Sequence, residues 1–124
     1  MYRNLYKEAK TMINNAYAPY SRFKVGAALM TKDGKIFKGA NIENASFGAG
    51  ICAEQVAVSA AVSAGEKEFD AIAVVSGEGS AWPCGICRQF MYEFSPEMKV
   101  ITGDDEDHLE VYELAELLPK GFVL

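Results

Sequence analysis

The sequence predicts an α/β fold in which one mixed β-sheet carries helices on its faces, and three observations lead to this class. Lys32-Asp33-Gly34 separates two strand-like segments, and an Asp-Gly pair is typical of a tight antiparallel hairpin. Beyond Gly50, helical and strand-like patterns alternate, as they do in layered α/β proteins. The chain has 124 residues, of which 50% are hydrophobic, so we expect a single domain spanning residues 1–124.

Apolar spacing predicts the first helix. Apolar side chains recur three, four, seven and eleven residues after Tyr2, which places them on one helical face. We expect this helix to end near Asn15, because Ala18-Pro19-Tyr20 interrupts the pattern. The two hairpin strands are then expected at Phe23–Leu29 and Lys35–Ala40.

Five further segments complete a predicted order of αββαβαβα. Alanine-rich residues before Gly65 predict a helix, and Pro83 is typical of the start of another, because proline costs no hydrogen bond there. In chain order the segments are helix Cys52–Ala64, strand Phe69–Ser76, helix Cys84–Phe94, strand Lys99–Thr102 and helix Val111–Leu118, which Pro119 ends. Strands that are separated by helices are expected to run parallel.

Charge and composition exclude several classes of partner. The formal net charge is −5 at pH 7, and an acidic chain repels the phosphates of nucleic acid, so we expect no nucleic-acid partner. No apolar run approaches the roughly 20 residues that a bilayer span needs, so no membrane partner is expected. Residues 1–10 mix basic and acidic side chains where a signal peptide would be apolar, which predicts a cytoplasmic protein.

The three cysteines predict a metal site. Their odd number, in a chain without an export signal, argues for reduced thiols rather than disulfides. Cys84 and Cys87 are three residues apart at a predicted helix start, so both sulfurs can reach one zinc ion at about 2.3 Å. Cys52 begins the other predicted helix and supplies a third ligand. With no fourth cysteine, and with His108 expected at the surface beside an acidic run, one Zn²⁺ per chain would keep an open position for water.

Glu54 follows Cys52 by two residues on the same predicted helical turn. A carboxylate placed there lies beside the metal without being a ligand, which is the position of a general base. The alternative is an ordinary first-turn glutamate that interacts favourably with the helix dipole, an effect worth about 1 kcal/mol or less.

These residues belong to longer motifs. Cys52-Ala53-Glu54 and Pro83-Cys84-Gly85-Ile86-Cys87-Arg88-Gln89 resemble the signature of zinc-dependent cytidine deaminases. Residues 18–27 (APYSRFKVGA) and 41–46 (NIENAS) are similar to that family's other two motifs. The resemblance therefore covers nearly the whole chain. It implies a three-layer α/β/α sandwich of the small three-cysteine type, which is typically homotetrameric.

The family resemblance also implies an activity. The chain would hydrolyse cytidine and 2′-deoxycytidine to uridine and 2′-deoxyuridine with release of ammonia, a reaction of pyrimidine salvage. Zinc-activated water would attack C4 of the pyrimidine ring. Glu54 would carry protons from that water to the ring and to the leaving amino group.

Five residues are assigned to substrate binding by the resemblance. Asn41 and Glu43 would hydrogen-bond a ribose hydroxyl, although the sequence alone favours a solvated strand end and only the resemblance reverses that order. Phe23 would pack against the base, whereas its place in an alternating strand also fits the core. Ala53 would line the site, and Phe122 would reach a neighbouring subunit's pocket instead of being a frayed tail residue.

The residue after Cys-Ala-Glu departs from the family pattern. The family commonly has an arginine there, which hydrogen-bonds the sulfurs and offsets their charge, whereas this chain has Gln55. Zinc with three thiolates carries a net charge of −1, which disfavours ionisation of its water. We expect the two helix N-termini to compensate, with Gln55 or Arg88 donating hydrogen bonds to sulfur.

Three other functions stay open at this point. Deaminases of the blasticidin S type share the metal motifs and also lack arginine after Cys-Ala-Glu, so the substrate could be another cytosine compound. A redox protein would use the thiols of Cys84 and Cys87, although Pro83 lies in the wrong place for a thioredoxin motif. A binding module with structural zinc would need His108 or a carboxylate as its fourth ligand.

Overall fold

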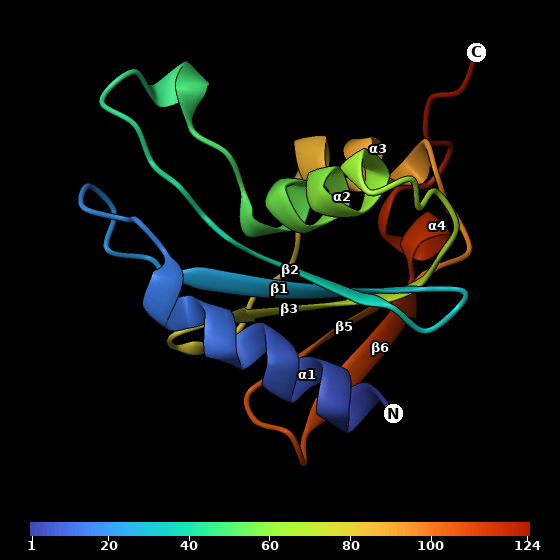
Figure 1. Ribbon diagram of the computed structural model, residues 1–124, viewed down its shortest axis with the longest axis horizontal. Coiled ribbons are helices and arrows are strands. Elements are labelled where there is room, and N and C mark those ends of the chain that lie inside the picture. The colour runs from blue at the N-terminus through green and yellow to red at the C-terminus, as the bar shows by residue number, and fades with distance from the viewer.

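The computed structural model describes residues 1–124 as a mixed sheet between two layers of helices (Figure 1). The strands are β1 (Val25–Thr31), β2 (Ile36–Ala40), β3 (Phe69–Ser76), β4 (Gly79–Ser80), β5 (Lys99–Gly103) and β6 (Leu109–Glu113). The helices are α1 (Tyr2–Thr11), α2 (Ala53–Ser63), α3 (Gly85–Tyr92) and α4 (Leu114–Leu117), with 3₁₀ turns η1 (Met12–Asn15) and η2 (Phe47–Ala49). None of the helices is both long enough and apolar enough to cross a membrane.

The sheet has the order β2-β1-β3-β5-β6, with the short β4 paired to β3. β1 and β2 form the antiparallel hairpin predicted from Asp33-Gly34, and Gly34 has the positive φ (86°) that such a turn requires. β1 pairs antiparallel with β3, and β3 pairs parallel with β5. The crossover from β3 to β5 contains α3, so this part of the chain is a βαβ unit.

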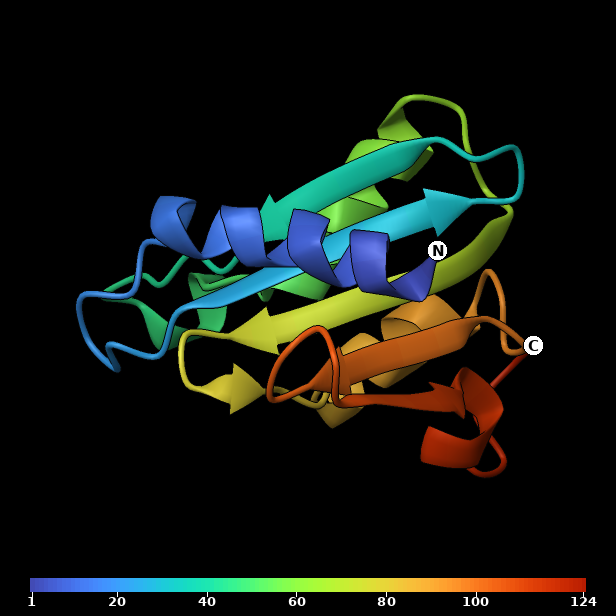
Figure 2. The same cartoon turned by 90° about the horizontal axis from the view of Figure 1, so that it is seen from below.

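The two faces of the sheet carry separate cores. α1 covers one face, and α2 and α3 lie on the other, as Figures 1 and 2 show from two directions. Because strand side chains alternate, successive residues of β1 join opposite cores. The core beneath α1 contains Leu5, Tyr6, Ala9, Ala28, Met30, Ala71, Ala73, Val75 and Ile101. The larger core beneath α2 and α3 includes Leu29, Ala57, Val58, Ala61, Phe69, Ile72, Val74, Met91, Met98 and Val100. The predicted three-layer sandwich is therefore confirmed.

The prediction of a last helix over residues 111–118 is wrong for its first half. Leu109–Glu113 form β6, and only Leu114–Leu117 are helical. β6 pairs antiparallel with β5, so the later strands are not all parallel. The free edge of β5 offers backbone partners to this segment, and Val111 and Tyr112 are residue types that favour strands. This pairing with the preceding strand outweighs the helical pattern of residues 111–113. The first helix likewise changes to a 3₁₀ turn after Thr11.

A glycine lets α2 approach the sheet closely. A Cβ built on Gly39 of β2 would lie 2.5 Å from the Ala53 carbonyl oxygen and 2.6 Å from the Ala57 nitrogen. Both of those atoms belong to the backbone of α2, so neither can turn aside as a side chain would. The start of α2 is thus seated directly on β2 by the absence of a side chain.

Gly39→Ala should therefore destabilise the fold. The added methyl group must push α2 off the sheet, so we expect a loss of roughly 1–3 kcal/mol in the free energy of unfolding. Urea denaturation measures this loss. Gly48→Ala is the matched control, because a Cβ there meets nothing within 4 Å. Equal stability of the two variants would contradict the close approach.

Candidate metal centre and active site

The starts of α2 and α3 bring all three cysteines together. Cys52 and Cys84 are the N-cap residues of the two helices, each with an extended backbone, and Cys87 lies in the first turn of α3. The three Sγ atoms all lie within 4.8 Å of one another, and the Sγ atoms of Cys84 and Cys87 are 3.3 Å apart. Two cysteines three residues apart at a helix start and one from a second helix thus converge as the sequence predicted.

This cluster fits a zinc ion. At a zinc–sulfur distance of about 2.3 Å, two ligands of one ion are separated by less than about 4.6 Å, so only small shifts of the side chains are needed. Three thiols are a donor set that zinc prefers. Cys87 is buried, Cys52 is half-buried and Cys84 is exposed, so the cluster opens to one side. The group contains no fourth histidine, cysteine or carboxylate, unlike a closed structural zinc site.

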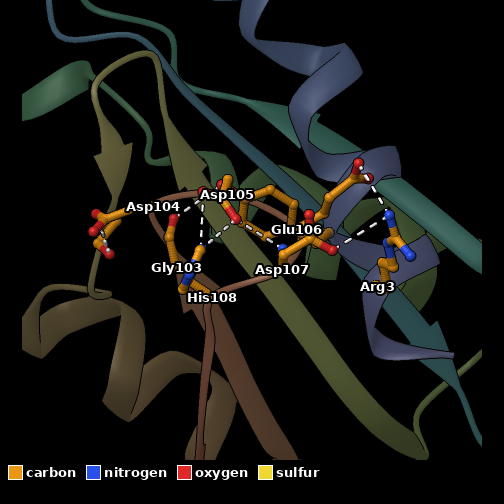
Figure 3. A network of polar contacts seen from close by, with 9 residues as sticks. Arg3, Gly103, Asp104, Asp105, Glu106, Asp107 and His108 are labelled. Atoms are coloured by element: carbon orange, nitrogen blue, oxygen red, sulfur yellow. Dashed lines mark hydrogen bonds and ion pairs between the residues drawn. The ribbon is translucent and has the colours of Figure 1, made fainter.

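His108 is a surface residue, as expected, and is not part of the group formed by the three thiols. Its side chain is 77% exposed and its Nδ1 lies 2.8 Å from Asp105 Oδ1 in the loop between β5 and β6. The hydrogen bond with that carboxylate raises the pKa of His108. Figure 3 shows the loop, in which Glu106 and Asp107 also pair with Arg3 of α1. The acidic run therefore fastens the loop to α1 and takes no part in the metal centre.

The thiols influence one another's ionisation. A hydrogen bond from the Cys87 thiol lowers the pKa of Cys52 to about 7. The same hydrogen bond with Cys52, followed by burial, raises the pKa of Cys87. Cys52 therefore loses its proton more readily than Cys87. Because metal ligation requires the thiolate form, binding of zinc would release the proton of Cys87.

Glu54 is buried beside the thiols. It is the second residue of α2, is only 4% exposed, and lines the same cavity as Cys52 and Cys84. Burial raises the pKa of its carboxyl group. An ordinary first-turn glutamate would be solvated, because an ionised carboxylate is costly to bury. The burial of Glu54 thus favours the general-base interpretation over the helix-dipole one.

Cys52, Cys84 and Glu54 form one part of the wall of a mostly apolar cavity of about 690 Å³. Its size and lining are typical of a site for a small organic molecule. The predicted residues Phe23, Asn41, Glu43 and Ala53 line it. So do residues that were not predicted, namely Tyr20, Ser21, Val25, Ile42, Asn44, Phe47, Gly50, Ile51, Val74, Ala81 and Trp82. Several of these lie inside the motifs at 18–27 and 41–46, which could have identified them.

Glu43 and Asn41 hold the loop at one wall of the cavity. Glu43 Oε1 accepts hydrogen bonds from the backbone N–H groups of Tyr20 and Ser21, both at 3.0 Å, and Oε2 accepts one from the Ser21 hydroxyl. These hydrogen bonds lower the pKa of Glu43. Asn41 accepts from Val25 N–H at 2.9 Å and donates to Phe23 O at 2.8 Å. The two side chains are therefore held by hydrogen bonds within the chain while they remain partly exposed.

The side chains of Gln55 and Arg88 do not donate to sulfur here. Gln55 Oε1 accepts a hydrogen bond from the Cys52 backbone N–H at 3.3 Å. In return, the backbone N–H of Gln55 points to the Cys52 side chain, which completes a capping box. Arg88 donates instead to two backbone carbonyl groups. The sulfur contacts expected of these side chains are replaced by contacts with the backbone, because both residues lie beside unpaired helix-end groups.

Phe122 lies outside the cavity of its own chain. Its ring is exposed, but its backbone is fastened to α3: Gln89 Nε2 donates to Phe122 O at 2.8 Å, and Phe122 N–H donates to Gln89 Oε1 at 3.0 Å. The residue is thus held at the surface instead of fraying.

Known proteins share this architecture and these motifs. Residues 1–103 match the family model described as the cytidine and deoxycytidylate deaminase zinc-binding region. The chain is 48% identical over 120 residues to a cytidine deaminase of Halalkalibacterium halodurans, covering 95% of this chain and 91% of that protein. It superimposes on the crystal structure of cytidine deaminase from Burkholderia pseudomallei with a TM-score of 0.92 and 46% identity, covering 98% and 99% of the two chains. For cytidine deaminase from Mycobacterium tuberculosis the TM-score is 0.86 at 39% identity, with 99% and 98% covered. The chain therefore belongs to the cytidine and deoxycytidylate deaminase family of zinc-binding hydrolases.

Proposed function

We propose that the protein hydrolyses cytidine and 2′-deoxycytidine to uridine and 2′-deoxyuridine and releases ammonia. The observation that carries the proposal is the buried carboxylate of Glu54 beside three thiols at the end of a nucleoside-sized cavity. The relatives named cytidine deaminase, which match nearly the whole chain, support the choice of substrate. In the cell this reaction would serve pyrimidine salvage in the cytoplasm.

Cys52, Cys84 and Cys87 would hold the zinc ion. When bound there, zinc supplies a Lewis acid that makes a water molecule acidic enough to act as a nucleophile near neutral pH. Glu54 would accept a proton from that water, because its carboxylate lines the same end of the cavity. It would deliver that proton to N3 as the water oxygen adds to C4, and would then move the proton of the resulting C4 hydroxyl group to the amino group, which leaves as ammonia, so that one carboxylate serves both steps. The buried position of Glu54 keeps bulk water from taking its place.

The other end of the cavity would bind the sugar and the base. Glu43 accepts three hydrogen bonds from its own chain, and a carboxylate has about four acceptor sites, so it can still accept one from a ribose hydroxyl. Asn41, fixed beside it, would make a second sugar contact. Phe23 would pack on the pyrimidine ring, with Ala53 forming part of the floor.

A homotetramer would complete the site. The last three residues expose apolar side chains, with Phe122 66% exposed although its backbone is hydrogen-bonded to Gln89. A fixed backbone with an exposed ring suits insertion into a neighbouring subunit. By the family resemblance, Phe122 would enter the partner's cavity. The acidic net charge is consistent with the absence of nucleic-acid partners.

The purified protein should contain one zinc ion per chain and release one ammonia per cytidine. Metal analysis measures the zinc content. The loss of cytidine absorbance, compared with the ammonia released, measures the second quantity. A metal-free protein with a reversible dithiol would instead indicate the redox function, and bound zinc without turnover would indicate a binding module. Turnover of blasticidin S but not of cytidine would indicate a different substrate for the same zinc-dependent deamination.

Glu54→Gln should lower turnover by roughly 10²–10⁴-fold, because the amide cannot accept the proton. The bound zinc should remain at one per chain, since Glu54 is not a ligand. Steady-state kinetics and metal analysis of the same sample check both parts. Glu97→Gln, at an exposed position outside the cavity, serves as the control. Turnover within tenfold of the unchanged protein would rule out the proton shuttle.

Glu43→Ala should weaken cytidine binding more than it slows the chemistry. The variant loses a sugar contact and releases the Tyr20-Ser21 loop, so we expect KM to rise about tenfold or more while kcat changes less. Initial rates over a range of cytidine concentrations separate the two constants. Glu97→Ala is the matched control. A fall in kcat at unchanged KM would place Glu43 in the chemical step instead.

A further inference from the structure

The C-terminal segment is fastened along α3, the helix that carries two of the thiols. The Gln89 side-chain amide makes paired hydrogen bonds with the backbone of Phe122, at 2.8 and 3.0 Å. One helical turn further on, the ring of Tyr92 lies so close to Gly121 that a Cβ there would come within 2.8 Å of it. The segment after α4 therefore lies directly on α3, which is visible in Figure 1 as the red chain end beside that helix.

Arg88 joins the C-terminal region to the loop before α3. Its Nε donates to the Pro83 carbonyl oxygen at 2.7 Å, and its Nη1 donates to the Leu117 carbonyl oxygen, also at 2.7 Å. Leu117 is the last residue of α4 and Pro83 directly precedes Cys84. The planar guanidinium group can make both bonds at once, and bonds from a charged donor are stronger than neutral ones.

The backbone before Cys84 makes few hydrogen bonds, although Pro83 is buried and the ring of Trp82 packs on that of Tyr112. Upstream, Ala81 N–H donates to Thr102 Oγ1, and the next backbone bond is from Arg88 N–H to Cys84 O. Pro83 has no N–H, and its carbonyl group receives a hydrogen bond from Arg88. Cys84 itself is exposed. Beside the burial of Pro83, the side chain of Arg88 is thus the polar restraint on the peptide that leads into this ligand.

The other end of the restraint is rigid. Leu114, one turn before Leu117, is fully buried, and its N–H donates to Met98 O at 2.8 Å. The Gln89 contact with Phe122 fixes the chain beyond Leu117. A hydrogen bond to Leu117 therefore ties Pro83 to a well-held part of the fold rather than to a loose chain end.

We propose that Arg88 is a positioning residue for the metal centre, which acts by holding the Pro83 carbonyl against the end of α4. Fixing that peptide fixes the backbone of Cys84, and so the distance of its sulfur from those of Cys52 and Cys87. Zinc affinity is sensitive to such support, because residues that orient ligands typically change it 10–100-fold when they are removed. The inference rests on the metal centre of the proposed function and not on its nucleoside substrate.

Two variants of Arg88 test this role. Arg88→Ala removes both hydrogen bonds, so zinc affinity, measured by competition with a chromogenic chelator, should fall 10–100-fold. In the cobalt(II)-substituted protein, the ligand-field and sulfur charge-transfer bands should shift, because they report the geometry of the three sulfurs. Arg88→Lys keeps the charge but cannot span both carbonyl groups. Its zinc affinity should therefore lie between that of Arg88→Ala and that of the unchanged protein.

Arg3→Ala is the matched control. Arg3 is a surface arginine that pairs with Glu106 and Asp107 on the opposite side of the sheet, so its loss should leave zinc affinity within twofold and the cobalt spectrum unchanged. If Arg88→Ala does not fold, Arg88→Lys decides the question. Unchanged zinc affinity and an unchanged cobalt spectrum in a folded Arg88 variant overturn the proposal. Neither readout needs cytidine, so a failure of the proposed deamination would be seen separately.

Discussion

The convergence of three sulfur atoms from two helix starts is the constraint on which the site depends. Metal–thiolate bonds tolerate errors of only a few tenths of an ångström, so α2 and α3 must be held at a fixed separation. Neither helix can achieve this alone, since each is short and stable only when packed. The sheet provides the common base. α2 is seated on β2 at Gly39, and the buried side chain of Met91 anchors α3 to the same core.

Charge is the second requirement of a centre with three thiolates. Each helix directs its unpaired N–H groups, and the positive end of its dipole, at the sulfurs. Gln55 illustrates how this chain differs from the common family pattern. Its side chain closes a capping box with the backbone of Cys52, where an arginine would offer a full positive charge to sulfur. The compensation of negative charge therefore falls mainly on the backbone of α2 and α3.

The sequence predicts those parts of the fold and site that are encoded locally. Cys84 and Cys87 are three residues apart, and the buried Glu54 lies two residues after Cys52, so motif spacing is sufficient to place them. The β6 strand was missed because the apolar spacing of residues 111–118 was interpreted as helical, whereas residues 109–113 pair with β5 across the acidic loop. The contact of Arg88 with Leu117 was missed because it spans 29 residues. The residue types and their spacing predicted the cysteine ligands. The contacts that hold those ligands in place come from parts of the chain that the motifs do not include.

Two kinds of structure form the cavity: helix termini on one side and loops on the other. The metal end is formed by helix termini packed on the sheet. The part that we propose for the sugar is formed by loops that hold one another: Ile42 makes single bridges to Tyr17 and to Ile51, and Glu43 accepts a hydrogen bond from Tyr20 N–H. Loops joined by a few polar contacts rearrange more easily than packed helices, because less apolar surface anchors them. Changes in the loops could therefore alter the group that this part of the cavity accepts without disturbing the thiols. Under the proposed function, the chemistry would belong to the part built on packed helices, and substrate choice to the part built from loops.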